Sequence, residues 1–227
     1  MTKGTRPKPR ASRKMVPADP YLGRPSLYSL DLLIPAYMTL NTEIAKWTHG
    51  RQLSPLQRAA CQIVPSGISI ALSIRELIRS GYLLSAEILT RPLLERVAVI
   101  SFLSKNGDAA LELWEKGWPH KSRPSLRKML SAIKEFDQFS SQAKLDQGTF
   151  LALANHLIDR YNSVVHGDPE GHLRNIGKTR SGTVGYLSGA SFSDPEKCDS
   201  ICIDATIFMS ILICRAAEIF PEAVGAS

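Results

Sequence analysis

Apolar residues recur at spacings of three and four along most of this chain, which is the period of an α-helix that buries one face. Leu33, Tyr37 and Leu40 are one such set. The predicted helices cover 29–47, 54–80, 82–105, 108–116, 125–139, 146–166 and a last helix from 195 to just before Pro221. The pattern therefore predicts an all-α protein, a multi-helix bundle of about six or seven helices.

Local signals set several of the helix boundaries. Ser54-Pro55 and Asp194-Pro195 each place a capping side chain before a proline at the first helical position. Pro65-Ser66-Gly67 predicts an interruption of the second helix, and Pro92 predicts a kink in the third. Residues 167–193 hold six glycines and predict a Gly-rich loop or small hairpin before the last helix, with 183–186 as one arm.

The first 26 residues differ from the rest of the chain. They carry five prolines and no apolar periodicity, which predicts a basic disordered arm and linker, followed by a single helical domain over 27–227. The basic residues of the arm are Lys3, Arg6, Lys8, Arg10, Arg13 and Lys14. Without these six cations the net charge of +7 falls to about +1 over the other 213 residues, so the basic character belongs to the arm. Such an arm either holds nucleic-acid phosphates or anionic lipid, or is a solvated tail.

The four cysteines and the longest apolar run bear on the cell compartment. Cys61, Cys198, Cys202 and Cys214 form no Cys-x-x-Cys pair and are expected to pack in the core in a reducing compartment, with no metal. The run 201–214 is interrupted by Asp204 and is shorter than the ~20 residues of a membrane-spanning helix. No secretory signal is visible. We therefore expect a cytoplasmic protein without membrane insertion.

Two polar groups lie on otherwise apolar helices. In the first, Glu87, Arg91 and Glu95 are four residues apart and share a helical face. They form a stabilising ion-pair ladder, a bridge to a neighbouring helix, or part of a binding site, because charges on an apolar helix need partners.

The second group lies in 155–168, at the end of its helix. Asp159, Asn162 and His166 share one face there, with Arg160 about 100° around the helix. Arg160 and His166 are either a surface ion pair and a helix-capping residue, or members of a site.

An arginine followed after five residues by a histidine, at the end of a helix in an all-helical chain, resembles the motif of the HEPN superfamily (higher eukaryotes and prokaryotes nucleotide-binding domains). The segment 86–95 together with the Val-His-Gly that closes 161–167 also resembles an uncharacterised all-helical bacterial family. The resemblance covers about 60–170. Tyr161 departs from the HEPN pattern, which often has a polar residue directly after the arginine.

The HEPN resemblance implies a metal-independent ribonuclease, or a degenerate relative, that uses no cofactor. It implies His166 as general acid or base and Arg160 as the group that stabilises the phosphate. Asp159 or Asn162 would orient His166, Arg91 and Glu95 would support the site, and a homodimer would complete it. RNA would be held by the arm and by Arg174, Lys178 and Arg180, and the biology would be bacterial toxin or antiphage defence.

Two other functions fit the same residues. One is a non-enzymatic helical scaffold or interaction protein, in which an Arg/Glu/His network fixes helix register. The other is a small-ligand pocket between helices with Arg91 as an anion anchor. The sequence contains no Gly-rich phosphate loop, His-Glu-x-x-His, Gly-x-Ser-x-Gly or EF-hand pattern, which disfavours nucleotide-dependent enzymes and metalloproteases.

Overall fold

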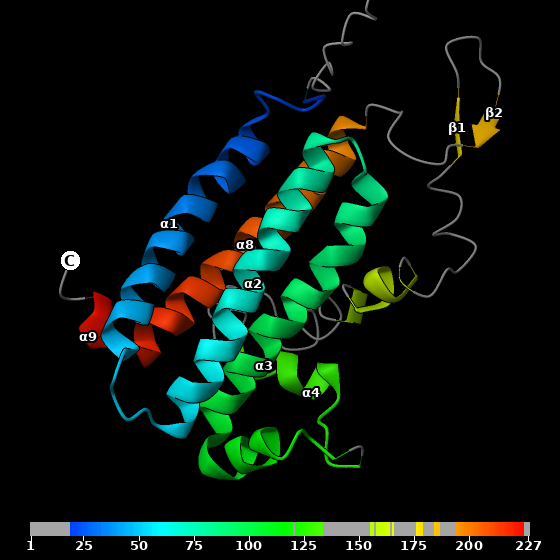
Figure 1. Cartoon of the computed structure of the whole chain (residues 1–227). Helices are drawn as coiled ribbons and strands as arrows, with labels where there is room; N and C mark the ends of the chain where they lie inside the picture. The colour runs from blue at the N-terminus through cyan, green and yellow to red at the C-terminus, as the bar shows by residue number, and fades with distance from the viewer. Residues whose placement is uncertain are drawn as a thin grey trace, which may run out of the picture.

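Four long helices form the bundle (Figure 1). They are α1 (Pro25–Thr48), α2 (Pro55–Arg79), α3 (Leu83–Glu115) and α8 (Pro195–Ile219). The computed structural model describes residues 19–119, 121–133, 155–156, 158–163, 165, 176–178, 184–186 and 194–224. Within these ranges the shorter elements are α4 (Leu126–Leu130), α9 (Pro221–Val224), and the strands β1 (Ile176–Lys178) and β2 (Val184–Tyr186). Residues 155–156, 158–163 and 165 are also helical. The predicted all-α bundle is confirmed.

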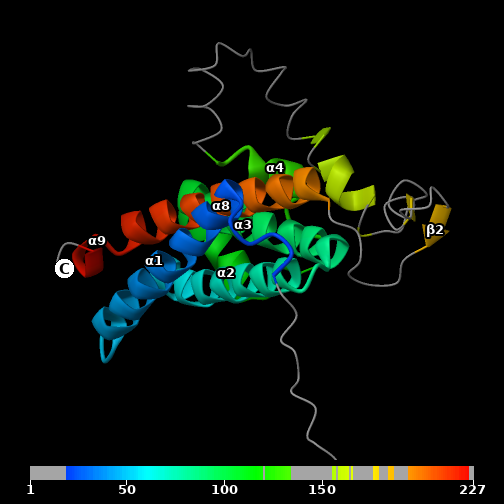
Figure 2. The ribbon, with the colours of Figure 1, turned by 90° about the horizontal axis from the view of Figure 1, so that it is seen from above.

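The last long helix, α8, packs against the first three (Figure 2). It runs parallel to α1, because the starts of the two helices contact each other and so do their ends. Arg24 and Ser26 hydrogen-bond Asp199 at the start, and the rings of Trp47 and Phe220 meet edge to face at 5.9 Å at the other end. The first and last helices of the bundle therefore lie side by side, although about 170 residues separate them.

Helix α2 begins where the sequence predicted. Ser54 accepts a hydrogen bond from the Gln57 backbone N–H, and the Gln57 side chain accepts one from the Ser54 backbone N–H, which is a complete capping box. The predicted interruption at 65–67 is wrong, because α2 is continuous through Pro65. A Cβ at Gly67 would lie 2.7 Å from Leu212 Cδ1 of α8, so the glycine allows close helix packing there. Tertiary packing thus offsets the backbone hydrogen bond that Pro65 removes.

Helix α3 contains a break at Gly107. This residue has φ 61° and ψ −147°, which is far from helical geometry and favours glycine. The predicted end of one helix at 106–107 and start of another at 108 are therefore confirmed. The helix predicted over 125–139 begins at its Ser125 cap, but α4 ends at Leu130 and Ser131 and Ala132 form a turn. The predicted helix is therefore not continuous at 131–133, and 134–139 lie outside the described residues.

The small hairpin predicted before the last helix is present. β1 and β2 pair antiparallel with Gly177 opposite Gly185.

The packed fold also includes the end of the segment predicted as arm and linker, because Tyr21 is 2% exposed and its hydroxyl accepts a hydrogen bond from the Asp194 backbone N–H.

Helix α8 is less completely buried than its apolar sequence predicts. Cys198 and Cys202 are buried, with their sulfur atoms 4.0 Å apart. Ile203 and Ile207 are about half exposed, and Cys214 is exposed, so the expectation that Cys214 packs in the core is wrong. One stripe of the helix faces outward, since positions 203, 207 and 214 share a side.

Two helices, α2 and α8, are long and apolar enough by length and composition to cross a membrane. Half of the apolar window of α8, and 39% of that of α2, is buried inside the fold. Core helices of soluble proteins meet the same criteria. The expected absence of membrane insertion stays a prediction.

Candidate functional site

Arg160 lies in a polar cluster between α3, the helical residues 155–165, and α8. Its Nε and Nη2 atoms both donate to Glu87 Oε1 at 3.3 Å, and Nη2 also donates to Ser200 Oγ at 2.8 Å. Its Nη1 atom lies 3.4 Å from Asp204 Oδ2. All three guanidinium nitrogens therefore have an acceptor. We call this set, with Lys197 and Tyr161, the Arg160 cluster.

Glu87 is the most deeply buried charged group of the cluster. Its side chain is fully buried, and it forms ion pairs with Arg160 and with Lys197. A buried carboxylate is tolerated when cations and hydrogen bonds compensate for its lost hydration. Two carboxylates, Glu87 and Asp204, face two cations, so the cluster is formally neutral.

Asp204 and Tyr161 form the second contact across the cluster. The Tyr161 hydroxyl donates to Asp204 Oδ2 at 2.7 Å. Burial raises the pKa of Asp204, while Tyr161 and Arg160 act in the opposite direction. The pKa of Tyr161 is also raised, first by burial and then by the Asp204 charge, so this hydroxyl stays protonated and acts as a donor.

The α8 residues of the cluster lie on one face of that helix. Lys197, Ser200 and Asp204 are spaced by three and four residues on one face of α8. Sliding α8 by one turn along α3 would separate Glu87 from Lys197 and leave the buried carboxylate with fewer partners. Chemically, the arrangement links three helical segments, and each nitrogen of the Arg160 guanidinium has an acceptor group beside it.

The predicted Glu87-Arg91-Glu95 ladder forms only in its second half. Arg91 Nε donates to Glu95 Oε1 at 3.3 Å. Glu87 instead pairs with residues 73 and 110 positions away, on other helices. Spacing along one helix indicates which side chains share a face, but it does not show which tertiary partner is closer.

Two further predicted site residues near Arg160, Asp159 and Asn162, are described, and neither is among the contacts of its guanidinium. Asp159 is exposed, and Asn162 is half-buried with an Oδ1 atom that has no hydrogen-bond partner. His166 lies outside the residues that the structure describes, as do 1–18, Arg174 and Arg180. Lys178 is described only as part of β1. The roles predicted for these residues stay predictions.

Sequence reasoning missed the contribution of α8. Lys197 and Ser200 were not singled out, and Asp204 was noticed only as an interruption of an apolar run. A lone carboxylate among apolar residues was the available signal, because an ionised group in that setting requires a partner.

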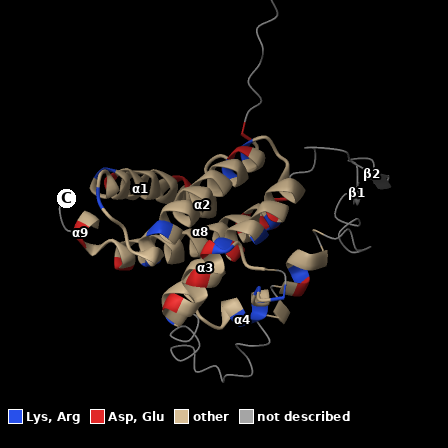
Figure 3. Cartoon of the chain, turned by 60° about the horizontal axis from the view of Figure 1, so that its bottom comes forward, with Lys and Arg blue, Asp and Glu red and all other residues tan. Residues whose placement is uncertain are grey.

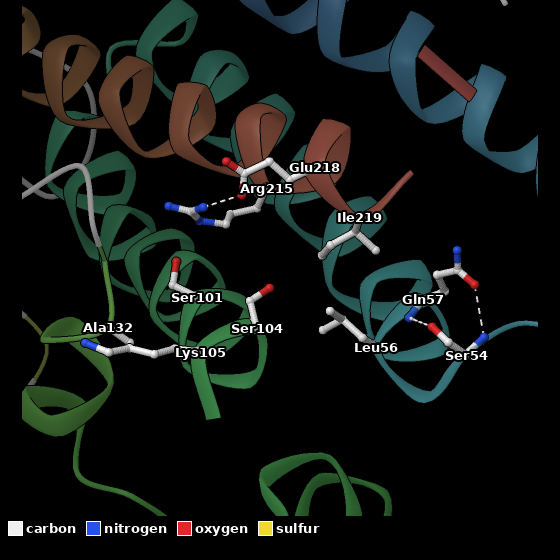
Figure 4. A pocket seen from close by; sticks show the side chains of 10 residues that line it. All are labelled: Ser54, Leu56, Gln57, Ser101, Ser104, Lys105, Ala132, Arg215, Glu218 and Ile219. Atoms are coloured by element: carbon white, nitrogen blue, oxygen red, sulfur yellow. Dashed lines mark hydrogen bonds and ion pairs between the residues drawn. The ribbon is translucent and has the colours of Figure 1, made fainter. Parts of the chain in front are cut away.

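Three cavities apart from the Arg160 cluster are relevant, and the smallest, of about 460 Å³, is lined by Arg58, Trp114 and Trp118 among others. A second has a volume of about 590 Å³ and is lined by residues of α2, α3 and α8 (Figure 4). Arg215 in this cavity pairs with Glu218, and the Lys105 ammonium donates to the Ser131 carbonyl at 3.3 Å. The third cavity, of about 610 Å³, lies beside Arg91 and Glu95.

Charge on the described helices is mixed rather than separated. Figure 3 shows Lys and Arg interspersed with Asp and Glu along them. Across the described ranges, no three His, Cys, Asp or Glu side chains gather as metal ligands do. The described body thus carries its charge as local pairs.

Fold and site together define an all-α bundle protein with a buried, charge-balanced cluster between its helices. The chain belongs to a family described as a family of unknown function (DUF5677), which it matches over residues 57–179, more than half of its length. This match agrees with the predicted uncharacterised all-helical family and leaves the HEPN resemblance unconfirmed. No curated protein and no solved structure matched the chain.

Proposed function

We propose that this protein is a non-enzymatic helical scaffold or interaction protein, in which the Arg160 cluster holds the bundle in one register. The observation that carries the proposal is the engagement of all three guanidinium nitrogens of Arg160 by Glu87, Asp204 and Ser200. A side chain held by three groups of its own protein favours a role in packing and helix register over a role in binding a ligand.

The alternative is a HEPN-like ribonuclease, and the contacts of Arg160 argue against it. In that mechanism the arginine must face the charge that grows on a phosphate. Arg160 would first have to leave Glu87, whose side chain is fully buried. Leaving a buried carboxylate with fewer partners costs several kcal/mol. The same phosphate would also approach the Glu87 and Asp204 carboxylates, which repel it.

The remaining parts of the ribonuclease prediction rest on resemblance and on the basic arm. They are RNA as partner, a homodimer and a role in bacterial defence. The cytoplasmic location was expected on other grounds, from the cysteines and the short apolar run. Each stays a prediction.

The test is RNA cleavage by the purified full chain, with and without EDTA, on single-stranded and structured RNAs. His166→Ala is the informative variant, because it leaves every residue of the Arg160 cluster in place. Arg58→Ala serves as a matched control for loss of an arginine, since the Arg58–Glu115 pair lies at the surface. We expect no cleavage above background by any of the proteins.

Metal-independent cleavage by the wild type that disappears in His166→Ala and Arg160→Ala, but not in Arg58→Ala, would overturn the proposal. Circular dichroism must show that the variants retain their helices. Because Arg160→Ala is expected to destabilise the bundle, Arg160→Lys provides a second variant with the charge retained.

A further inference from the structure

The cavity beside Arg91 is built from three consecutive parts of the fold. Arg91 and Glu95 come from α3, Trp118 from the turn that follows it, and the rest from the loop and helix of α4. The residues from the last part are Arg123, Pro124, Ser125, Leu126 and Met129. Its volume of about 610 Å³ lies within the range of small-molecule sites.

Two donors among the lining residues have no acceptor. Arg91 uses Nε for Glu95, but its Nη1 atom is buried without a hydrogen-bond partner in the described structure. The Nε1 atom of Trp118 is buried and without a partner as well. A buried donor left unpaired costs about 1–3 kcal/mol, so two of them beside one cavity indicate that an acceptor belongs there.

The backbone at Trp118 is held in an unusual conformation. Its φ is 47°, and among the described residues it is the one non-glycine with a positive φ. The indole also packs edge to face on Trp114, with ring centroids 5.0 Å apart. Strain of this kind persists where surrounding contacts fix a side chain, and it is concentrated at ligand sites. Trp118 and Arg91 both line the cavity.

Charge and polarity define the ligand. Two cations, Arg91 and Arg123, outnumber the one carboxylate, Glu95, which is already paired. The lining also has an apolar part, formed by the Trp118 ring, Leu126 and Met129. The donors favour an anionic head, and the apolar part favours a hydrophobic body.

We propose that this cavity binds a small organic anion, with the anionic head accepting hydrogen bonds from Arg91 Nη1 and Trp118 Nε1–H and the apolar body against Leu126 and Met129. The proposal adds a ligand site to the scaffold and does not depend on the Arg160 cluster.

The test reads the proposed donor directly by NMR. The chain has three tryptophans, so a ¹⁵N-labelled sample gives three indole N–H signals, and Trp118→Phe assigns that of Trp118 by its disappearance. The probes are 2-naphthoate and its uncharged counterpart 2-naphthamide, which differ in the head alone. We expect 2-naphthoate to shift the Trp118 indole signal in a saturable way and 2-naphthamide to leave it nearly unchanged. Inorganic phosphate, which lacks the apolar body, should bind more weakly than 2-naphthoate.

Two arginine variants separate the cavity from general attraction of anions. Arg91→Gln should weaken 2-naphthoate binding about tenfold or more, since a charge-assisted hydrogen bond is lost. Arg79→Gln is the matched control, because Arg79 is half exposed and does not line the cavity. It should bind like the wild type. If Arg91→Gln loses its dispersed spectrum, ligand-observed saturation transfer on Trp118→Phe provides the same comparison.

No saturable shift in the wild type would overturn the proposal. So would equal binding of the acid and the amide, or unchanged affinity in a folded Arg91→Gln variant.

Discussion

Replacing Arg160 by Met should destabilise the bundle far more than replacing an exposed arginine. Methionine keeps much of the side-chain length and apolar packing but removes the charge and all donors. Glu87 and Asp204 would each lose a cationic partner, while Lys197 and Tyr161 would remain beside them.

The size of the effect follows from burial. Removing one partner of a fully buried ion pair costs roughly 3–5 kcal/mol. Glu87 is fully buried, but Arg160 is 21% exposed and Lys197 remains next to Glu87. We therefore expect a loss of about 2–3 kcal/mol in the free energy of unfolding, below the fully buried case.

The assay is urea denaturation of the full chain, followed by circular dichroism. Arg58→Met is the control, because its pair with Glu115 is 49% and 44% exposed and should contribute about 0–1 kcal/mol. In a double-mutant cycle, Arg160→Met and Glu87→Gln together should cost at least about 1 kcal/mol less than the sum of the two single losses. Equal losses for Arg160→Met and Arg58→Met would refute the register role of the cluster.

Three further changes test other parts of the fold. Ser54→Ala should lower the free energy of unfolding by about 1 kcal/mol through loss of the α2 capping box, whereas Ser73→Ala, at an exposed mid-helix site, should cost less; similar losses would contradict this. Gly67→Val should lower the free energy of unfolding by about 1–3 kcal/mol, because the added side chain overpacks against Leu212. An unchanged urea midpoint would contradict close packing of α2 and α8 at this position. The pKa of Asp199 is lowered to about 2 by hydrogen bonds from Arg24 and Ser26, so its contribution is present above the ordinary pKa of 3.8 and is lost as pH falls toward 2. Thermal denaturation should therefore show the gap between wild type and Asp199→Asn shrinking over that window, and a constant gap would disprove the assignment.

Local signals in the sequence predicted the features that depend on a few neighbouring residues. The Ser54-Pro55 and Asp194-Pro195 starts are correct, because capping involves atoms within one turn. The interruption predicted at Pro65 is wrong, since the cost of a proline was judged without knowing that Leu212 packs on Gly67 beside it.

The candidate site was predictable only in outline. Glu87, Arg91 and Arg160 were singled out because charges on apolar helices need partners, and each has one. The identity of those partners depends on how α8 packs against α3, which no pattern within a single helix reveals. Asp204 is the clearest example. The sequence showed a carboxylate within an apolar run, but it did not show that this carboxylate accepts a hydrogen bond from Tyr161.

The place of α8 in the chain has a consequence for how the protein folds during synthesis. The helix that covers α1, α2 and α3 starts at residue 195, about 80 residues after α3 ends, so it leaves the ribosome later than all three. At about 5–20 residues per second, the first three helices wait roughly 5–20 s for their partner, with apolar faces open to solvent. The nascent chain is therefore a natural client for chaperones that shield such surfaces, and a premature stop before Pro195 yields an aggregation-prone remnant rather than a smaller folded protein.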